Sequence, residues 1–159
     1  MSTAANKKKN VLIIGVGNRF RHDDGVGPYL IERLKKTLAG SADLVERSGE
    51  GAELMETWKN YSTVYLIDAV SSGKKPGTLH HFNATQQKLP QNFFHYSTHA
   101  FSIAEAIELA RALNELPNQL IVYGIEGKNF TSGEGLSKKV EEAARVVEQS
   151  LLRGPSTKS

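Results

Sequence analysis

The sequence predicts a three-layer α/β/α domain, in which helices cover both faces of a mostly parallel, twisted sheet of about five strands. Apolar runs alternate with amphipathic segments along the 159 residues, the runs are apolar enough to be buried on both faces, and neither a repeat nor a linker interrupts them. We therefore expect one domain over residues 1–159, with flexible tails at 1–9 and 153–159.

The expected elements follow one another as β-α-β-α-β-β-α-β-α. Short apolar runs predict strands, and apolar residues that recur every three or four positions predict helices, as for Leu30, Leu34 and Leu38. The strands are expected at 11–17, 42–48, 62–70, 78–84 and 119–127. The helices are expected at 27–38, 51–60, 101–114 and 136–152, with turn-rich or irregular loops at 71–77 and 86–100. Ser102 and Glu105 are spaced to form a capping box at the start of the third helix.

Composition narrows the possible functions. The chain has no cysteine, so any metal must be held by Asp, Glu, His or backbone oxygen. No apolar run approaches the roughly 18 residues of a membrane span, and the basic start leads directly into a strand, so a cytoplasmic protein without a membrane partner is expected. Much of the basic excess behind the formal charge of +3 lies near the two ends, and no basic face carries interleaved aromatic residues, so no nucleic acid partner is expected.

The stretch GVGNRFRHDDGVG joins the first strand to the first helix, and its glycines are typical of a phosphate-binding loop. Gly15 and Gly17 fit the dinucleotide fingerprint, but Phe20 stands at its third glycine and no Gly-Lys-Ser/Thr follows. The carboxylates of Asp23 and Asp24 would repel a phosphate and attract a cation. Nucleotide or metabolite binding is therefore disfavoured, although either aspartate alone could be a helix N-cap.

Polar side chains also follow other strands, at the sheet edge where α/β proteins bind ligands. Asp68 follows four apolar residues, where a carboxylate is costly unless it is paired, liganded or bonded to loop amides. His99 precedes a helix in a loop that could return to this edge or simply hydrogen-bond within itself. Glu126 ends the last strand and could pair with Lys128 or cap a turn. Asp24, Asp68 and His99 together form a candidate site whose oxygen and nitrogen donors suit zinc or nickel, with positions left open.

These motifs, taken together, resemble the hydrogenase maturation proteases, the endopeptidases that trim the C-terminal tail of the large subunit of [NiFe] hydrogenases. The resemblance rests on G-V-G-N-R-F-R-H-D-D-G-V-G, L-I-D-A-V, S-T-H and the late G-I-E-G in that order, and it covers residues 10–152. It implies a twisted, mostly parallel sheet between helices. It also implies that Asp24, Asp68 and His99 are both the catalytic residues and the metal ligands.

One position departs from the family pattern, because the second acid of the loop is often Glu and is here Asp24, one methylene shorter. The assignment of the ligand to Asp24 rather than Asp23 therefore stays open, and Asp23 is expected to cap or brace the loop. Asp23 or Asp24 is also an alternative general base, if the metal neither polarises the scissile carbonyl nor activates water.

The resemblance implies a partner and a metal as well. The partner is a [NiFe] hydrogenase large-subunit precursor, and the nickel that it carries is recognised before the tail is cut, with zinc or cadmium as possible surrogates. The protein is expected to be a monomer or a weak oligomer. The departure at Asp24 keeps one alternative, a metal-binding maturation chaperone that has the same fold and does not cleave.

Overall fold

The computed structural model of the protein describes residues 9–90, 93 and 99–153. Its strands and helices run in the predicted order, with an additional 3-10 turn, η1 (His22–Gly25), after the first strand. The strands are β1 (Lys9–Val16), β2 (Asp43–Arg47), β3 (Tyr61–Val70), β4 (Leu79–Asn83) and β5 (Gln119–Glu126). The helices are α2 (Val26–Leu38), α3 (Gly51–Trp58), α4 (Ile103–Ala112) and α5 (Lys138–Leu152). Most of both predicted tails and part of the predicted irregular stretch 86–100 lie outside the described residues.

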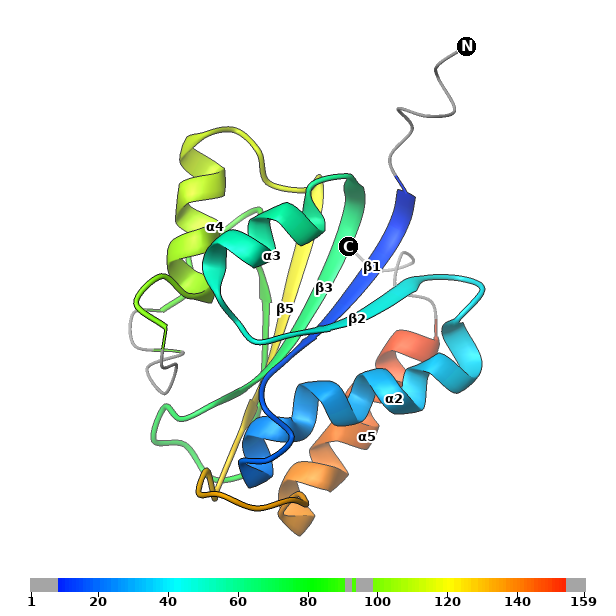
Figure 1. Cartoon of the computed structure of the whole chain (residues 1–159), viewed down its shortest axis with the longest axis vertical. Helices are drawn as coiled ribbons and strands as arrows, with labels where there is room; N and C mark the ends of the chain where they lie inside the picture. The colour runs from blue at the N-terminus through cyan, green and yellow to red at the C-terminus, as the bar shows by residue number, and fades with distance from the viewer. Residues whose placement is uncertain (1–8, 91–92, 94–98, 154–159) are drawn as a thin grey trace.

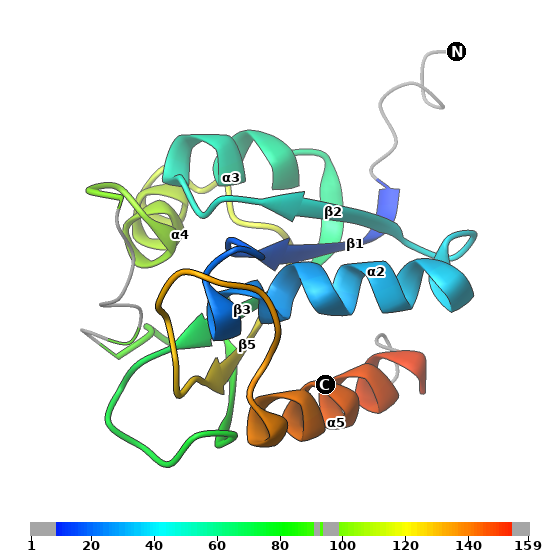
Figure 2. The same ribbon diagram turned by 60° about the horizontal axis from the view of Figure 1, so that its bottom comes forward.

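The five strands form one twisted sheet in the order β2-β1-β3-β5-β4 (Figure 1). Neighbouring strands are parallel except for β4, which pairs antiparallel with β5 at the edge of the sheet. Helices α2 and α5 cover one face, and α3 and α4 cover the other (Figure 2). The predicted three-layer architecture and mostly parallel sheet are confirmed.

The central strand β3 shows why its apolar run is continuous. Val64 and Leu66 belong to the core beneath α3 and α4, whereas Tyr65 and Ile67 belong to the core beneath α2 and α5. Successive side chains of a strand point to opposite faces, so a strand covered on both faces needs apolar residues at every position. Full burial of one such aliphatic side chain is worth about 1.5–3 kcal/mol.

The helix ends both confirm and correct the sequence predictions. Ser102 and Glu105 form the predicted capping box at the start of α4. Helix α2 begins after Gly25 without a side-chain cap, so the N-cap alternative for Asp23 and Asp24 is wrong; both lie in η1 instead. Helix α5 begins at Lys138, slightly later than predicted, because Ser137 is its N-cap. No described helix is both long and apolar enough to cross a membrane.

The direction of chain winding reverses between β1 and β3. The chain leaves β1 through α2 on one face and reaches β2 on one side, then passes through α3 on the opposite face to reach β3 on the other side of β1. Such a reversal leaves a crevice at the carboxyl ends of the two strands. Gly15 pairs with Ile67, so Asp68 lies level with the end of β1, at this crevice.

Candidate functional site

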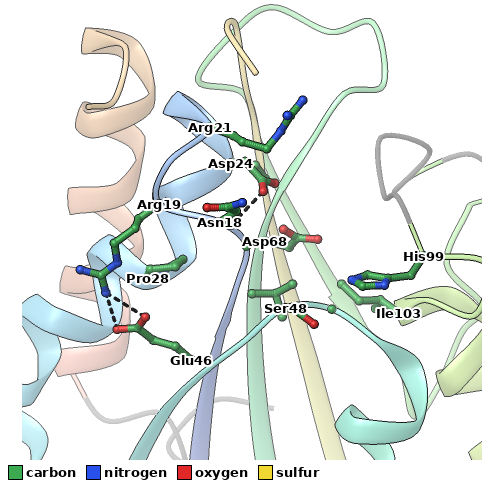
Figure 3. A pocket seen from close by; sticks show the side chains of 14 residues that line it. Asn18, Arg19, Arg21, Asp24, Pro28, Glu46, Ser48, Asp68, His99 and Ile103 are labelled. Carbon is green, nitrogen blue, oxygen red and sulfur yellow. Dashed lines mark hydrogen bonds and ion pairs between the residues drawn. The ribbon is translucent and has the colours of Figure 1, made fainter. Parts of the chain in front are cut away.

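A cavity of about 450 Å³ opens at the carboxyl ends of β1, β2 and β3, and all three predicted site residues line it (Figure 3). Asp24 reaches it from the loop after β1, Asp68 from β3, and His99 from the segment before α4. The side chains thus come from three separate parts of the chain, and the fold brings them around one hollow at the β1/β3 crevice.

Two glycines allow the chain to turn tightly at the end of β1. A Cβ on Gly15 would lie 2.4 Å from the carbonyl oxygen of Gly27, so the absence of a side chain lets helix α2 approach the strand. Gly17 has φ +139°, and a Cβ there would lie 1.9 Å from the carbonyl oxygen of Asp24. Only glycine adopts this conformation without strain, so Gly17 lets the chain leave the strand in a tight turn.

Asp24 is held by the backbone of this turn. Its Oδ2 accepts a hydrogen bond of 2.9 Å from the amide N–H of Asn18, while the Asn18 side chain accepts one from the amide of Phe20. Partial burial raises the pKa of the Asp24 carboxyl, and the Asn18 amide and the nearby Arg21 guanidinium only partly offset this. The turn therefore presents a carboxylate to the cavity with few groups to stabilise its charge.

Asp68 lies on the α3/α4 face of β3, opposite to its apolar neighbours Ile67 and Ala69. Its side chain is 7% exposed. Burial raises the pKa of the Asp68 carboxyl well above its ordinary value, the negative charge of Asp24 raises it further, and the amide N–H of Ala69 offsets only part. Two partly desolvated carboxylates that repel each other are stabilised by a proton or by a cation.

The segment that carries His99 is attached to the start of α3. The amide of Gly51 donates a 2.8 Å hydrogen bond to the carbonyl oxygen of Phe101, two residues after His99. A Cβ on Gly49 would lie 3.8 Å from the ring carbon Cδ2 of His99, so the backbone of the β2–α3 turn lies beside the imidazole. These contacts and the capping box of α4 place His99 at the cavity.

The donor set fits a divalent ion of borderline softness, since it offers two carboxylates and one imidazole without thiolate. Within the described ranges, however, no group of three His, Cys, Asp or Glu side chains is close enough to hold one ion. The structure thus gathers Asp24, Asp68 and His99 around one cavity and brings Asp24 and Asp68 close enough to repel each other. The side chains would have to move together to share an ion.

Asp23 braces the loop, as the sequence predicted. It is 0% exposed and accepts hydrogen bonds from the backbone amides of Lys128, Asn129 and Ser137 and from the Ser137 hydroxyl. Burial alone would raise the pKa of the Asp23 carboxyl, but these hydrogen bonds together lower it below its ordinary value. Because its oxygens are already used, Asp24 is the acid of this loop that lines the cavity.

Glu126 is also a structural carboxylate. It accepts hydrogen bonds from the backbone amide and hydroxyl of Ser72 and from the imidazole of His80, at 2.6, 2.7 and 3.0 Å. The suggested pairing with Lys128 is wrong, because the carboxylate oxygens of Glu126 bind Ser72 and His80, and among the described residues its ion pair is with His80. Glu126 does not line the cavity.

Two polar groups at the cavity were not found from the sequence. One is the backbone amide of Asn18, and the other is an ion pair at the cavity's rim, where Arg19 donates from Nη2 to both carboxylate oxygens of Glu46 at 2.8 Å (Figure 3). Arg19 also lies 3.7 Å from the carboxylate of Glu32. The β1–β2 register brings the Arg19 loop and Glu46 together, and nothing local in the sequence signals this pair.

Comparisons with known proteins agree with this architecture. The sequence model of the hydrogenase maturation protease family matches residues 28–153, more than half of the chain, beginning beyond Asp24. A protein from Methanocaldococcus jannaschii with a provisional hydrogenase maturation protease name is 29% identical over 91% of this chain and 94% of its own. The hydrogenase 2 maturation protease of Escherichia coli is 26% identical, over 89% and 88%.

Solved structures show the same fold. The solution structure of an endopeptidase from Escherichia coli superposes with a TM-score of 0.78 at 24% identity, covering 91% of this chain and 90% of that one. The extent of the family match, together with the shared fold, is decisive: the chain belongs to the hydrogenase maturation protease family.

Proposed function

We propose that this protein is the endopeptidase that removes the C-terminal extension of a [NiFe] hydrogenase large-subunit precursor, and that Asp24, Asp68 and His99 bind the nickel carried by that precursor. Membership in a protease family supports the reaction class. The observation that carries the assignment of residues is the pair of carboxylates, Asp24 and Asp68, that face one cavity with His99 at the β1/β3 crevice.

The charge arrangement explains why processing would depend on nickel. Asp24 and Asp68 repel each other and are both harder to ionise than ordinary carboxyls. A divalent cation placed between them removes this repulsion and gains two charged oxygen donors. A precursor without nickel offers no such gain, so it would bind this cavity more weakly.

The residues of this chain have separate tasks in the proposed reaction. The Asn18 amide orients the Asp24 carboxylate, and the start of α3 and the cap of α4 hold His99 at the opposite side of the cavity. The bound metal would supply Lewis-acid polarisation of the scissile carbonyl or of a water molecule. A cavity of about 450 Å³ has the size of a small-ligand pocket, so it would take a metal centre and the few atoms around one peptide bond.

The test is the intact mass of a cognate large-subunit precursor after incubation with this protein, with and without nickel in the precursor. Loss of one C-terminal peptide only from the nickel-loaded sample is the expected result. Equal loss from both samples would contradict nickel recognition while leaving the protease intact. Stable binding without any loss of mass, for a precursor that another enzyme can process, would contradict the endopeptidase and favour the non-cleaving chaperone.

A further inference from the structure

Strand β2 has an open side that leads to the cavity. It lies at one edge of the sheet, and in the described part of the chain only β1 pairs with it. All five of its residues are partly exposed. Glu46, Ser48 and Gly49, at and just beyond the end of this strand, line the cavity. β1 and β3 also end there, but each already has a neighbour on both sides.

The register of the sheet shows which backbone groups of β2 face outward. The amide of Gly17 donates to the carbonyl oxygen of Arg47, so the backbone of Arg47 faces the β1 side. Backbone groups alternate between the two sides of a strand, so Val45 also faces β1. The amide and carbonyl groups of Leu44 and Glu46 therefore face away from the sheet.

We infer that the C-terminal tail of the precursor binds in extended form as an additional strand along β2, through hydrogen bonds to the outward-facing backbone groups of Leu44 and Glu46. This inference rests on the proposed function, because it takes a polypeptide substrate whose scissile bond lies in the cavity. An extended peptide that enters the cavity past Glu46 continues along β2 at about 3.3 Å per residue. Pairing with a sheet edge holds a peptide through its backbone, largely independently of its sequence.

Arg47 occupies part of this edge in the free protein. Its Nη1 donates a 2.7 Å hydrogen bond to the carbonyl oxygen of Glu46, while its Nε donates to the hydroxyl of Thr57 on α3. Charged side chains on edge strands protect the edge from pairing with other copies. An incoming tail would displace the Nη1 contact and replace it with a backbone amide, so the edge stays protected until the substrate arrives.

The contribution of each backbone amide of the precursor tail can be tested separately. Nickel-loaded precursors would be made by protein ligation, each with one tail amide replaced by an ester, which removes a single N–H donor. Alternate replacements are expected to lower kcat/KM roughly five- to tenfold, because a lost hydrogen bond costs about 1 kcal/mol. The replacements between them should have little effect.

Pairing of the tail with β2 can also be measured on this protein by residue-resolved hydrogen exchange. The complex would be formed with a precursor whose scissile bond is reduced to a non-hydrolysable CH2–NH link. The amides of Leu44 and Glu46 are expected to exchange more slowly, and those of Val45 and Arg47, already in the sheet, to stay unchanged. The outer edge of β4, at the far side of the sheet, is the internal control and should not change.

The outcomes separate this inference from the proposed function. Processing of the unmodified precursor without an alternating ester pattern, and with unchanged exchange at Leu44 and Glu46, would overturn the β2 docking and leave the endopeptidase standing. Failure to process the unmodified nickel-loaded precursor would overturn both.

Discussion

Asp23 and Asp24 are adjacent in the chain but have opposite surroundings. Asp23 is fully buried, yet its four hydrogen bonds bring the pKa of its carboxyl below the ordinary value. Asp24 is less buried, yet burial raises the pKa of its carboxyl, because the Asn18 amide and the nearby Arg21 guanidinium offset only part of the effect. Asp68 likewise is slightly more exposed than Asp23 and still has a raised pKa.

The comparison shows that the supply of hydrogen-bond donors, rather than burial, separates the two kinds of carboxylate. Donors stabilise the ionised form and make it part of the structure, as for Asp23 and Glu126. A pair of carboxylates that accepts few hydrogen bonds can still bind a cation, because little else stabilises its negative charge. Asp24 and Asp68 are such a pair, which is why we assign them to binding rather than to folding.

The largest expected effect is on processing by Asp68→Asn. Removal of one charged ligand should lower the processing rate by roughly 10²–10⁴-fold, the range typical of a lost catalytic group. The free energy of unfolding should fall by no more than about 1 kcal/mol, and it could rise, because the substitution removes the repulsion between Asp68 and Asp24. Intact-mass kinetics and urea unfolding measure the two quantities, with Glu56→Gln on the exposed side of α3 as a control that should change neither.

Asp23→Ala should affect mainly the stability of the protein, in contrast to Asp68→Asn, which should affect mainly the processing rate. The substitution of Asp23 leaves three part-buried amides and one hydroxyl without their acceptor, so the free energy of unfolding should fall by about 3–5 kcal/mol. The milder Ser137→Ala removes only the hydroxyl donor and should cost about 1 kcal/mol. Urea unfolding checks both values, and a loss for Asp23→Ala no greater than that for Ser137→Ala would argue against the brace.

Glu126 should give a smaller effect that depends on pH. Burial opposes its ionisation, but the Ser72 hydroxyl and amide and the His80 imidazole lower the pKa of its carboxyl on balance. Because the folded pKa is depressed, this contribution is present above the unfolded value of about 4.3 and is lost as pH falls through the folded pKa.

Urea unfolding of wild type and Glu126→Gln at a series of pH values from about 3 to 6 tests this sign. The stability advantage of the wild type should shrink as the solution becomes more acid. An advantage that is constant with pH would show that the carboxylate charge does not contribute.

The smallest effect is expected at the rim of the cavity. Arg19 donates from Nη2 to both carboxylate oxygens of Glu46, but 42% and 34% of the two side chains are exposed, so solvent screens the pair. Arg19→Ala should therefore lower the free energy of unfolding by roughly 0.2–1 kcal/mol. Thermal unfolding would measure it, and a loss comparable to that of Asp23→Ala would contradict the distinction between braced and solvent-screened carboxylates.

The fold could be predicted well from the sequence, because the spacing of apolar residues within each segment distinguishes the strands from the helices. The convergence of Asp24 and Asp68 was also predictable, since Asp24 follows one parallel strand and Asp68 lies near the carboxyl end of the next, at the same edge of the sheet. The partners of Asp23 were not predictable, because Ser137 is 114 residues away and reads locally as an ordinary helix cap. The same holds for Glu126, whose contact with His80 depends on the antiparallel pairing of β4 with β5.

The most direct test of the nickel-binding assignment is X-ray absorption at the nickel edge. The spectrum of the nickel-loaded precursor alone would be compared with that of its complexes with wild-type protein and with Asp68→Asn, frozen before processing. If Asp24, Asp68 and His99 bind the nickel, it should gain oxygen or nitrogen neighbours in the wild-type complex and fewer of them with Asp68→Asn. An unchanged nickel environment in a wild-type complex that goes on to process its precursor would contradict this assignment.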